Sequence, residues 1–293
     1  MKRILFVGAG DIAQRTARLL QDRYRLYGLA RSGERAALLR RQHILPLAGD
    51  LDAPASLQRL AGVAEWLVHL APPPAHGERD SRTANLLRAL TKRGSLPHGV
   101  VYISTSGVYG DCHGELASET REPAAHTARA RRRVDAERQL RNWAQRHRLK
   151  LAILRVPGIY ASDRLPLERI RNATPALRDE DDGYTNHIHA DDLARAIVLA
   201  LHRQAGIRIF NVVDDSRLKM GEYFDLVADA VGLPRPPRIA RSEAEGRISP
   251  AMLSFMDESR TLLNQRLHQE LRLRLRYPTV ESALAQLKPA NAR

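Results

Sequence analysis

The sequence is short of cysteine, aromatic residues and long apolar runs. Cys112 is the single cysteine among 293 residues, so an intramolecular disulfide and a cysteine-based zinc site are excluded. One cysteine fits the reducing cytoplasm, where we expect the protein to reside. No run approaches the roughly 18 uninterrupted apolar residues that a membrane helix needs, and we therefore expect no membrane partner.

Lysine is scarce too, because only five of the 47 basic residues are lysine and the net charge of +14 comes from arginine. The densest arginine run, at 129–133, opens a pattern typical of an amphipathic helix. We interpret it as a solvated helix face; the alternative is a phosphate-rich ligand or partner. Aromatic residues are 5% of the chain, and neither a recognition helix nor a basic tail is recognisable. We therefore expect no specific nucleic-acid binding.

Apolar, β-branched segments alternate with helical patterns through the first half of the chain. Strands are expected over residues 4–7, 24–30, 44–48, 66–71, 100–104 and 151–156, and helices over 12–20, 34–41, 55–60, 82–92 (ending near Gly94) and from 129 onward. This alternation predicts βαβ units and a parallel sheet. The strands are apolar throughout, which indicates helices on both faces. The predicted fold class is α/β, with a doubly wound parallel sheet.

The pattern changes after Pro157. Helices are expected over 165–170 and 192–201 and one more strand over 207–213, and the remainder is rich in loops. We expect residues 1–164, completed by about 186–213, to form the sheet domain, and 165–293 to form mostly a smaller C-terminal lobe. Ligands of such folds bind outside the carboxyl ends of the strands, so a lobe on this substrate side would close a pocket.

A glycine-rich motif follows the first expected strand and reads G-x-G-x-x-A over residues 8–13. Gly8 permits a tight turn, Gly10 lets the backbone approach a pyrophosphate, and the small Ala13 allows close helix packing. The phosphates would lie at the helix N-terminus, beside Asp11 and Ile12. Between a strand and a helix, this motif predicts a Rossmann-type dinucleotide site.

The residues after the second expected strand select the dinucleotide. An acid there would bind the ribose 2′-hydroxyl of NAD, but the strand is followed by Arg31 and Ser32. These two, helped by Arg35, can hold a 2′-phosphate through charge-assisted hydrogen bonds. The sequence therefore favours NADP over NAD. Asp50 and Leu51, after the third strand, are expected beside the adenine.

The segment at 101–111, Val-Tyr-Ile-Ser-Thr-Ser-Gly-Val-Tyr-Gly-Asp, resembles the active-site turn of extended short-chain dehydrogenases/reductases. That family contains nucleotide-sugar epimerases and dehydratases. Residues 69–71, 155–160, 186–194 and 210–212 resemble further segments of the family, in the same order. The segment at 104–110 also argues against a β-hydroxyacid dehydrogenase, which shares the glycine motif. The resemblance implies that Leu70, Ala71 and Pro157 lie against the cofactor.

The chain departs from the family at the catalytic residues. The resemblance implies a proton-transferring tyrosine with a lysine four residues later, assisted by a serine or threonine, and Thr105 matches the last of these. At the start of the next helix, however, either Thr127 and Arg131 or Arg129 and Arg133 occupy the tyrosine and lysine positions. This departure resembles an atypical subgroup of NADP-binding epimerases with degenerate sites.

Three other residues, of which His113 is one, are candidates for the missing proton transfer, and water is the alternative. In the atypical subgroup an aspartate replaces an active-site asparagine, and Asp80 is its candidate here. Tyr109 is a further candidate acid, although its family position usually packs without transferring the proton. His187 and His189 would need further ligands to hold a metal, so no metal is expected.

Three functions compete at this point. The first is an NADP-dependent reductase or epimerase acting on a small polar or nucleotide-linked substrate, as a monomer or homodimer. The second is a non-catalytic NADP-binding redox sensor or regulatory protein, which the missing tyrosine and lysine favour. The third, a nucleic-acid binder, has only the net charge in its support.

Overall fold

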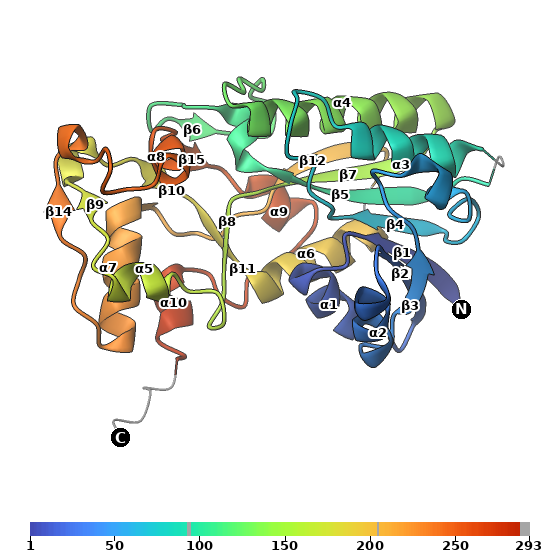
Figure 1. Cartoon of the computed structure of the whole chain (residues 1–293), viewed down its shortest axis with the longest axis horizontal. Helices are drawn as coiled ribbons and strands as arrows, with labels where there is room; N and C mark the ends of the chain where they lie inside the picture. Colours follow the sequence, from blue (N-terminus) through green and yellow to red (C-terminus); the bar gives the residue numbers. More distant parts are fainter. Residues whose placement is uncertain (93–94, 204, 288–293) are drawn as a thin grey trace.

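A seven-stranded parallel sheet forms the centre of the protein (Figure 1). The computed structural model describes residues 1–92, 95–203 and 205–287. In spatial order the strands are β12 (Ile207–Asn211), β7 (Lys150–Val156), β5 (Gly99–Thr105), β4 (Trp66–His69), β1 (Lys2–Val7), β2 (Tyr24–Ala30) and β3 (Leu45–Ala48). The chain order reverses beside β1, which leaves a crevice at the carboxyl ends of β1 and β4 where ligands of such folds bind.

Helices cover both faces of the sheet, because successive strand residues point to opposite sides. On β1, Ile4 and Phe6 face one apolar core while Leu5 and Val7 face the other. The first core is covered by α1 (Asp11–Arg18), α2 (Gly33–Arg41), α6 (Ala190–Arg203) and α9 (Gln265–Gln269), and the second by α3 (Ser81–Thr91) and α4 (Ala128–His147). Figure 1 shows α3 and α4 above the sheet and α1, α2 and α6 below it. The predicted doubly wound α/β fold is confirmed.

A third apolar core lies beyond the carboxyl ends of the strands, at the left of Figure 1. It is built mainly from residues after Pro157. The elements of this region are β8 (Gly158–Tyr160), α5 (Leu167–Arg171), β9 (Ala176–Leu177), η3 (Asp179–Asp181), β10 (Tyr184–Thr185), β11 (His187–His189), β13 (Leu218–Lys219), α7 (Met220–Val231), β14 (Arg238–Ile239), η4 (Arg241–Glu243), α8 (Pro250–Met256), β15 (Thr261–Leu262) and α10 (Val280–Leu284). β15 pairs with β6 (Leu116–Ala117), which joins this region to the loop after β5.

Several expected elements differ in the structure. The strand expected over 207–213 ends at Asn211, and the helix expected over 12–20 ends at Arg18. The helix expected over 55–60 is a single 3-10 turn, η1 (Pro54–Leu57); the Ser56 hydroxyl accepts from the Asp50 N–H at 2.8 Å and holds this segment to the loop after β3. The strand expected over 66–71 ends at His69, because the next two N–H groups both turn to the Val7 carbonyl. Helix α3 ends at Thr91, and Gly94, its expected end, lies outside the described residues.

Candidate functional site

The glycine loop between β1 and α1 has the geometry that its sequence motif predicts. Gly8 has φ +89° and a β-carbon there would lie 2.3 Å from the Ala71 nitrogen, so no other residue fits. At Gly10 nothing lies within 4 Å of the β-carbon position. Gly10 precedes α1, whose first N–H groups, at Asp11 and Ile12, have no acceptor within the helix. The loop therefore leaves open space beside a helix N-terminus, where an anion is favoured.

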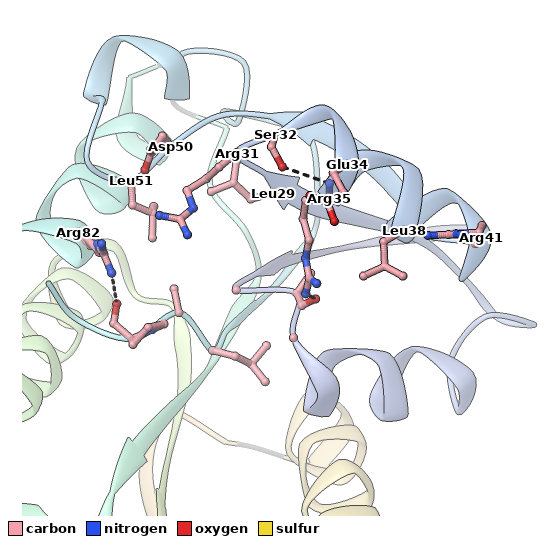
Figure 2. A pocket seen from close by; sticks show the side chains of 16 residues that line it. Leu29, Arg31, Ser32, Glu34, Arg35, Leu38, Arg41, Asp50, Leu51 and Arg82 are labelled. Atoms are coloured by element: carbon pink, nitrogen blue, oxygen red, sulfur yellow. Dashed lines mark hydrogen bonds between the residues drawn. The ribbon is translucent and has the colours of Figure 1, made fainter. Parts of the chain in front are cut away.

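A cavity of about 680 Å³ opens over this loop (Figure 2). Its lining comes from the carboxyl ends of β1 to β4, from the length of α2 and from the start of α3. The lining residues are Gly8, Ala9, Gly10, Leu29, Arg31, Ser32, Glu34, Arg35, Leu38, Arg41, Asp50, Leu51, Leu70, Ala71, Pro72 and Arg82. Nine residues proposed from the sequence as cofactor contacts are among them, so segments that are remote in sequence line one cavity.

Two arginines enter this cavity from the β2–α2 connection. Figure 2 shows Arg31 reaching across the cavity from the end of β2, while Arg35 reaches back toward the glycine loop. Arg35 donates to the Ala9 carbonyl. Ser32 caps α2 by accepting the Arg35 N–H at 3.2 Å, which leaves the hydroxyl hydrogen free to donate. Arg31 and Arg35 thus offer cationic donors, and Ser32 a neutral donor, at one corner of the cavity.

The opposite wall carries the loop after β3. The Asp50 Oδ1 accepts the Asp52 N–H at 3.0 Å, and the Leu51 carbonyl accepts the side-chain amide of Asn85 at 2.8 Å. Arg82, from α3, forms an ion pair with Asp52 at 2.6 Å and donates to the Pro72 carbonyl at 3.1 Å. Arg82 holds the β3 and β4 loops together, and no local motif marked it.

Asp11 and Ile12 do not line the cavity with their side chains. Asp11 forms ion pairs with Arg15 and Arg164, each at 3.0 Å, and Ile12 packs against the first apolar core. Only their backbone N–H groups remain for a ligand. The Asp11–Arg164 pair joins the start of α1, beside the glycine loop, to the segment that follows β8.

A second cavity, of about 420 Å³, lies at the carboxyl ends of β5 and β7, next along the same sheet edge. Thr105 ends β5, and its register partner Val156 precedes Pro157 on β7. Thr105 and Pro157 both line this cavity rather than the first. The Thr105 Oγ1 accepts the Gly107 N–H at 3.2 Å, so its own hydrogen is free to donate toward a substrate.

Tyr109 and Asp80 lie away from both cavity linings. Tyr109 is 0% exposed and donates to the Asn211 Oδ1 at 2.7 Å, and burial raises its pKa. Asp80 is 1% exposed, caps α3 and accepts the Thr83 N–H and hydroxyl at 3.0 and 2.8 Å. Burial raises the pKa of Asp80 as well. Neither side chain is among the residues that line the two cavities, and the proton transfer expected of each stays a prediction.

The two residue pairs proposed for the tyrosine and lysine positions have different surroundings. Thr127 caps α4 and Arg131 pairs with Glu78 on the surface. Arg129 lines the second cavity, and Arg133, one turn later, donates to the Ile103 carbonyl at 2.9 Å on β5. Arg129 therefore faces the cavity, and Arg133 faces the adjoining strand.

Sequence reasoning missed the far wall of the second cavity, because its residues come from segments far apart in the chain. His187 is 4% exposed, its ring lies 4.1 Å from that of Tyr223, and burial lowers its pKa to about 3. Glu258 and Arg260 pair at 2.8 Å and are also buried. His187 therefore lines the cavity as a neutral ring, and Glu258 brings a carboxylate to it.

Two further kinds of site were sought. Within residues 1–92, 95–203 and 205–287 no group of three or more histidine, cysteine, aspartate or glutamate side chains is arranged to hold a metal ion. In those same ranges, none of the helices combines the length and the apolar character required to cross a bilayer.

Comparisons with known proteins found a matching family model and similar solved structures. The model of the NAD dependent epimerase/dehydratase family matches residues 7–212. Protein YeeZ of Escherichia coli (strain K12) is 26% identical over 152 residues, which are 50% of this chain and 51% of YeeZ, so the match spans about half the length of that relative. A conserved protein of unknown function from Silicibacter pomeroyi DSS is 26% identical with a TM-score of 0.82 over 97% of each chain. The UDP-glucose 4-epimerase of Thermotoga maritima, solved with UDP-glucose, has a TM-score of 0.77 at 18% identity over 96% of each chain.

Proposed function

The chain belongs to the NAD dependent epimerase/dehydratase family, and from that premise we propose that it binds NADP in preference to NAD in the cavity over the glycine loop. The observation that carries this proposal is the position of Arg31 and Ser32 at the end of β2, inside the cavity lining. An arginine in this place suits a ribose 2′-phosphate, whereas a carboxylate would suit the 2′-hydroxyl of NAD.

A dinucleotide bound in this cavity would extend along the sheet edge toward the second cavity. The strand order places β2 and β3 on one side of β1, and β4 and β5 on the other. Adenosine would lie beside Asp50 and Leu51, the pyrophosphate over Gly10, and the nicotinamide toward Leu70 and Thr105. The open space at Gly10 supports the pyrophosphate position, because backbone can approach there without a side chain.

The charge of the lining favours the more anionic dinucleotide. Arg31, Arg35, Arg41 and Arg82 face the cavity against the acids Glu34 and Asp50. Arg82 is neutralised by Asp52, but the arginines at 31, 35 and 41 have no ion pair among the described residues. A phosphate bound there would gain charge-assisted hydrogen bonds from planar guanidinium groups.

We propose further that the protein acts as an oxidoreductase or epimerase of low proton-transfer capacity. A bound nicotinamide would accept or donate hydride, and Thr105 would donate a hydrogen bond to a substrate oxygen. Arginine at the tyrosine and lysine positions stays protonated and can only bind or stabilise negative charge. The substrate would be small and polar, or nucleotide-linked like the UDP-glucose of the Thermotoga maritima enzyme.

The second candidate is a non-catalytic NADP-binding protein that senses redox state or regulates a partner. The side chains at the two proton-handling positions, Arg129 and Arg133, favour it, because neither can replace a tyrosine. NADP binding is common to both candidates, and the fate of a substrate proton separates them.

Binding of the cofactor's adenosine half tests the proposal without any substrate. Adenosine 2′,5′-bisphosphate should bind at least roughly tenfold more tightly than adenosine 5′-monophosphate in calorimetric titrations, because a charge-assisted hydrogen bond contributes about 1.5–3 kcal/mol. The two ligands differ only in the 2′-phosphate. Equal affinities would remove the support for NADP and leave NAD as the dinucleotide.

A further inference from the structure

The second cavity contains an arginine without an acceptor. Within the described parts of the chain, Arg129 makes neither a hydrogen bond nor an ion pair. Its guanidinium carbon lies 3.8 Å from the ring centroid of Phe255, on α8. Burial lowers the Arg129 pKa, although nearby Glu258 acts in the opposite direction. A guanidinium group held over a phenyl ring keeps N–H groups that are free to donate, and such groups suit a carboxylate.

Glu258 brings an unsatisfied acceptor to the same cavity. The residue is 8% exposed and its Oε2 accepts from Arg260 at 2.8 Å. Its Oε1 is buried and, in the portion of the chain that the structure describes, has no hydrogen-bond partner. An unpartnered carboxylate oxygen in a buried position is costly unless a donor reaches it. Protein atoms cover Oε1, whereas Oε2 can accept a second donor beside the one from Arg260.

Thr105 and Glu258 face one point. A β-carbon built on Gly107 would lie 3.6 Å from the Thr105 Oγ1 and 3.8 Å from the Glu258 Oε2. Thr105 has a free hydrogen to donate, because its oxygen already accepts the Gly107 N–H. Glu258 can only accept when ionised. A ligand hydroxyl group fits between them, since it accepts from one and donates to the other.

We propose that the second cavity binds a small hydroxycarboxylate, whose carboxylate pairs with Arg129 and whose hydroxyl lies between Thr105 and Glu258. The inference deepens the proposed function, because it rests on the nicotinamide lying toward Thr105 and names the substrate class beside it. Arg260 and Glu258 neutralise each other, so Arg129 supplies the uncompensated charge. Arg164, the remaining arginine of this lining, is paired with Asp11.

Calorimetric titration of 2-hydroxybutyrate, with 1,2-butanediol as a neutral control, tests the inference. The carboxylate compound should bind at least roughly tenfold more tightly than the diol, and Arg129→Gln should abolish that advantage. Arg131→Gln is the matched control on the same helix, because Arg131 pairs with Glu78 outside the cavity. Arg129→Lys keeps the charge without the planar edge and should retain only part of the advantage.

The titrations are made with the free protein and with saturating NADPH, so that two failures can be told apart. If NADPH does not bind, the proposed function fails, and titration of the free protein still tests the cavity. If NADPH binds but 2-hydroxybutyrate binds no better than the diol, the substrate inference is wrong and the cofactor proposal stands. Equal loss of affinity in Arg129→Gln and Arg131→Gln would also overturn it, because a general charge effect would then explain binding.

Discussion

Arg155 and Glu137 form an ion pair in the interior of the protein, with 2.9 Å between Nη2 and Oε2 and side chains that are 1% and 0% exposed. The Ser104 hydroxyl donates to the same carboxylate at 2.6 Å. The pair therefore joins β7, α4 and the residue of β5 that precedes Thr105. It fixes the strand ends that line the second cavity.

Glu137→Gln should lower the free energy of unfolding by about 3–5 kcal/mol, because it leaves the buried Arg155 charge uncompensated. Urea unfolding followed by circular dichroism measures this change. Arg121→Gln is the control, since its pair with Glu115 is exposed on the surface and should contribute less than about 1 kcal/mol. Similar effects of the two substitutions would contradict the role assigned to the buried pair.

Gly8→Ala and Gly10→Ala should differ in what they damage. Gly8 has a positive φ and touches the Ala71 backbone, so Gly8→Ala should destabilise the fold by more than about 1 kcal/mol. Gly10 faces open space, so Gly10→Ala should keep the wild-type melting temperature and lose NADPH affinity, because its methyl group enters the pyrophosphate position. Thermal melts and fluorescence titration measure the two effects; an unaltered NADPH affinity in Gly10→Ala would place the ligand elsewhere.

Asp214 should make stability depend on pH, because burial raises its pKa to about 7. The folded state holds this proton more tightly than the unfolded state, whose aspartate titrates near 3.9. The contribution of Asp214 to stability therefore falls as the pH rises from about 4 to about 7. Above that range this contribution no longer changes with pH. The buried His69 and His187, whose pKa values are lowered to about 3, have the opposite effect. They lower the stability as the pH falls below about 6.5.

Asp214→Asn removes the aspartate contribution and leaves those of the histidines. The free energy of unfolding of the variant, relative to the wild type, should be higher at pH 8 than at pH 5 by about 2–3 kcal/mol. Urea unfolding at the two pH values measures this difference. A difference that does not vary with pH would show that Asp214 titrates normally in the folded protein.

Turnover on ordinary epimerase and dehydratase substrates should be slight or absent. The Thr105 hydroxyl has too high a pKa for general acid catalysis near neutrality, and Arg129 and Arg133 stay protonated. Product chromatography with UDP-glucose and NADP⁺ measures epimerisation, which consumes no NADPH, and Thr105→Val should barely alter NADPH affinity. A robust rate that is lost in Thr105→Val would mean that the degenerate site is competent after all.

The sequence predicted what depends on neighbours in the chain. The glycine loop and Arg31 could be interpreted together because they lie within about 20 residues of one another in the sequence. The apolar runs located each strand of the sheet. The 3-10 turn at Pro54–Leu57 was mistaken for a helix, because periodicity over a few residues does not report the Ser56 contact that holds the segment.

The second cavity could not be predicted in the same way. Thr105, Arg129, His187 and Glu258 meet there from four separate segments, and no local spacing links them. The choice between Arg129 and Arg131 depends on helix register, since two residues differ by about 200° around a helix. The cap at Thr127 and the packing of the buried face of α4 set that register.

The preference between the two dinucleotides tests the central claim most directly. Dissociation constants of NADPH and NADH are measured by fluorescence titration for the wild type and for Arg31→Asp, at one salt concentration. The wild type should bind NADPH more tightly, and Arg31→Asp should weaken NADPH and favour NADH, because the new carboxylate repels the 2′-phosphate and can accept a ribose hydroxyl. A ratio of the two constants that is the same in both proteins would contradict the assignment of Arg31 and, with it, the preference for NADP.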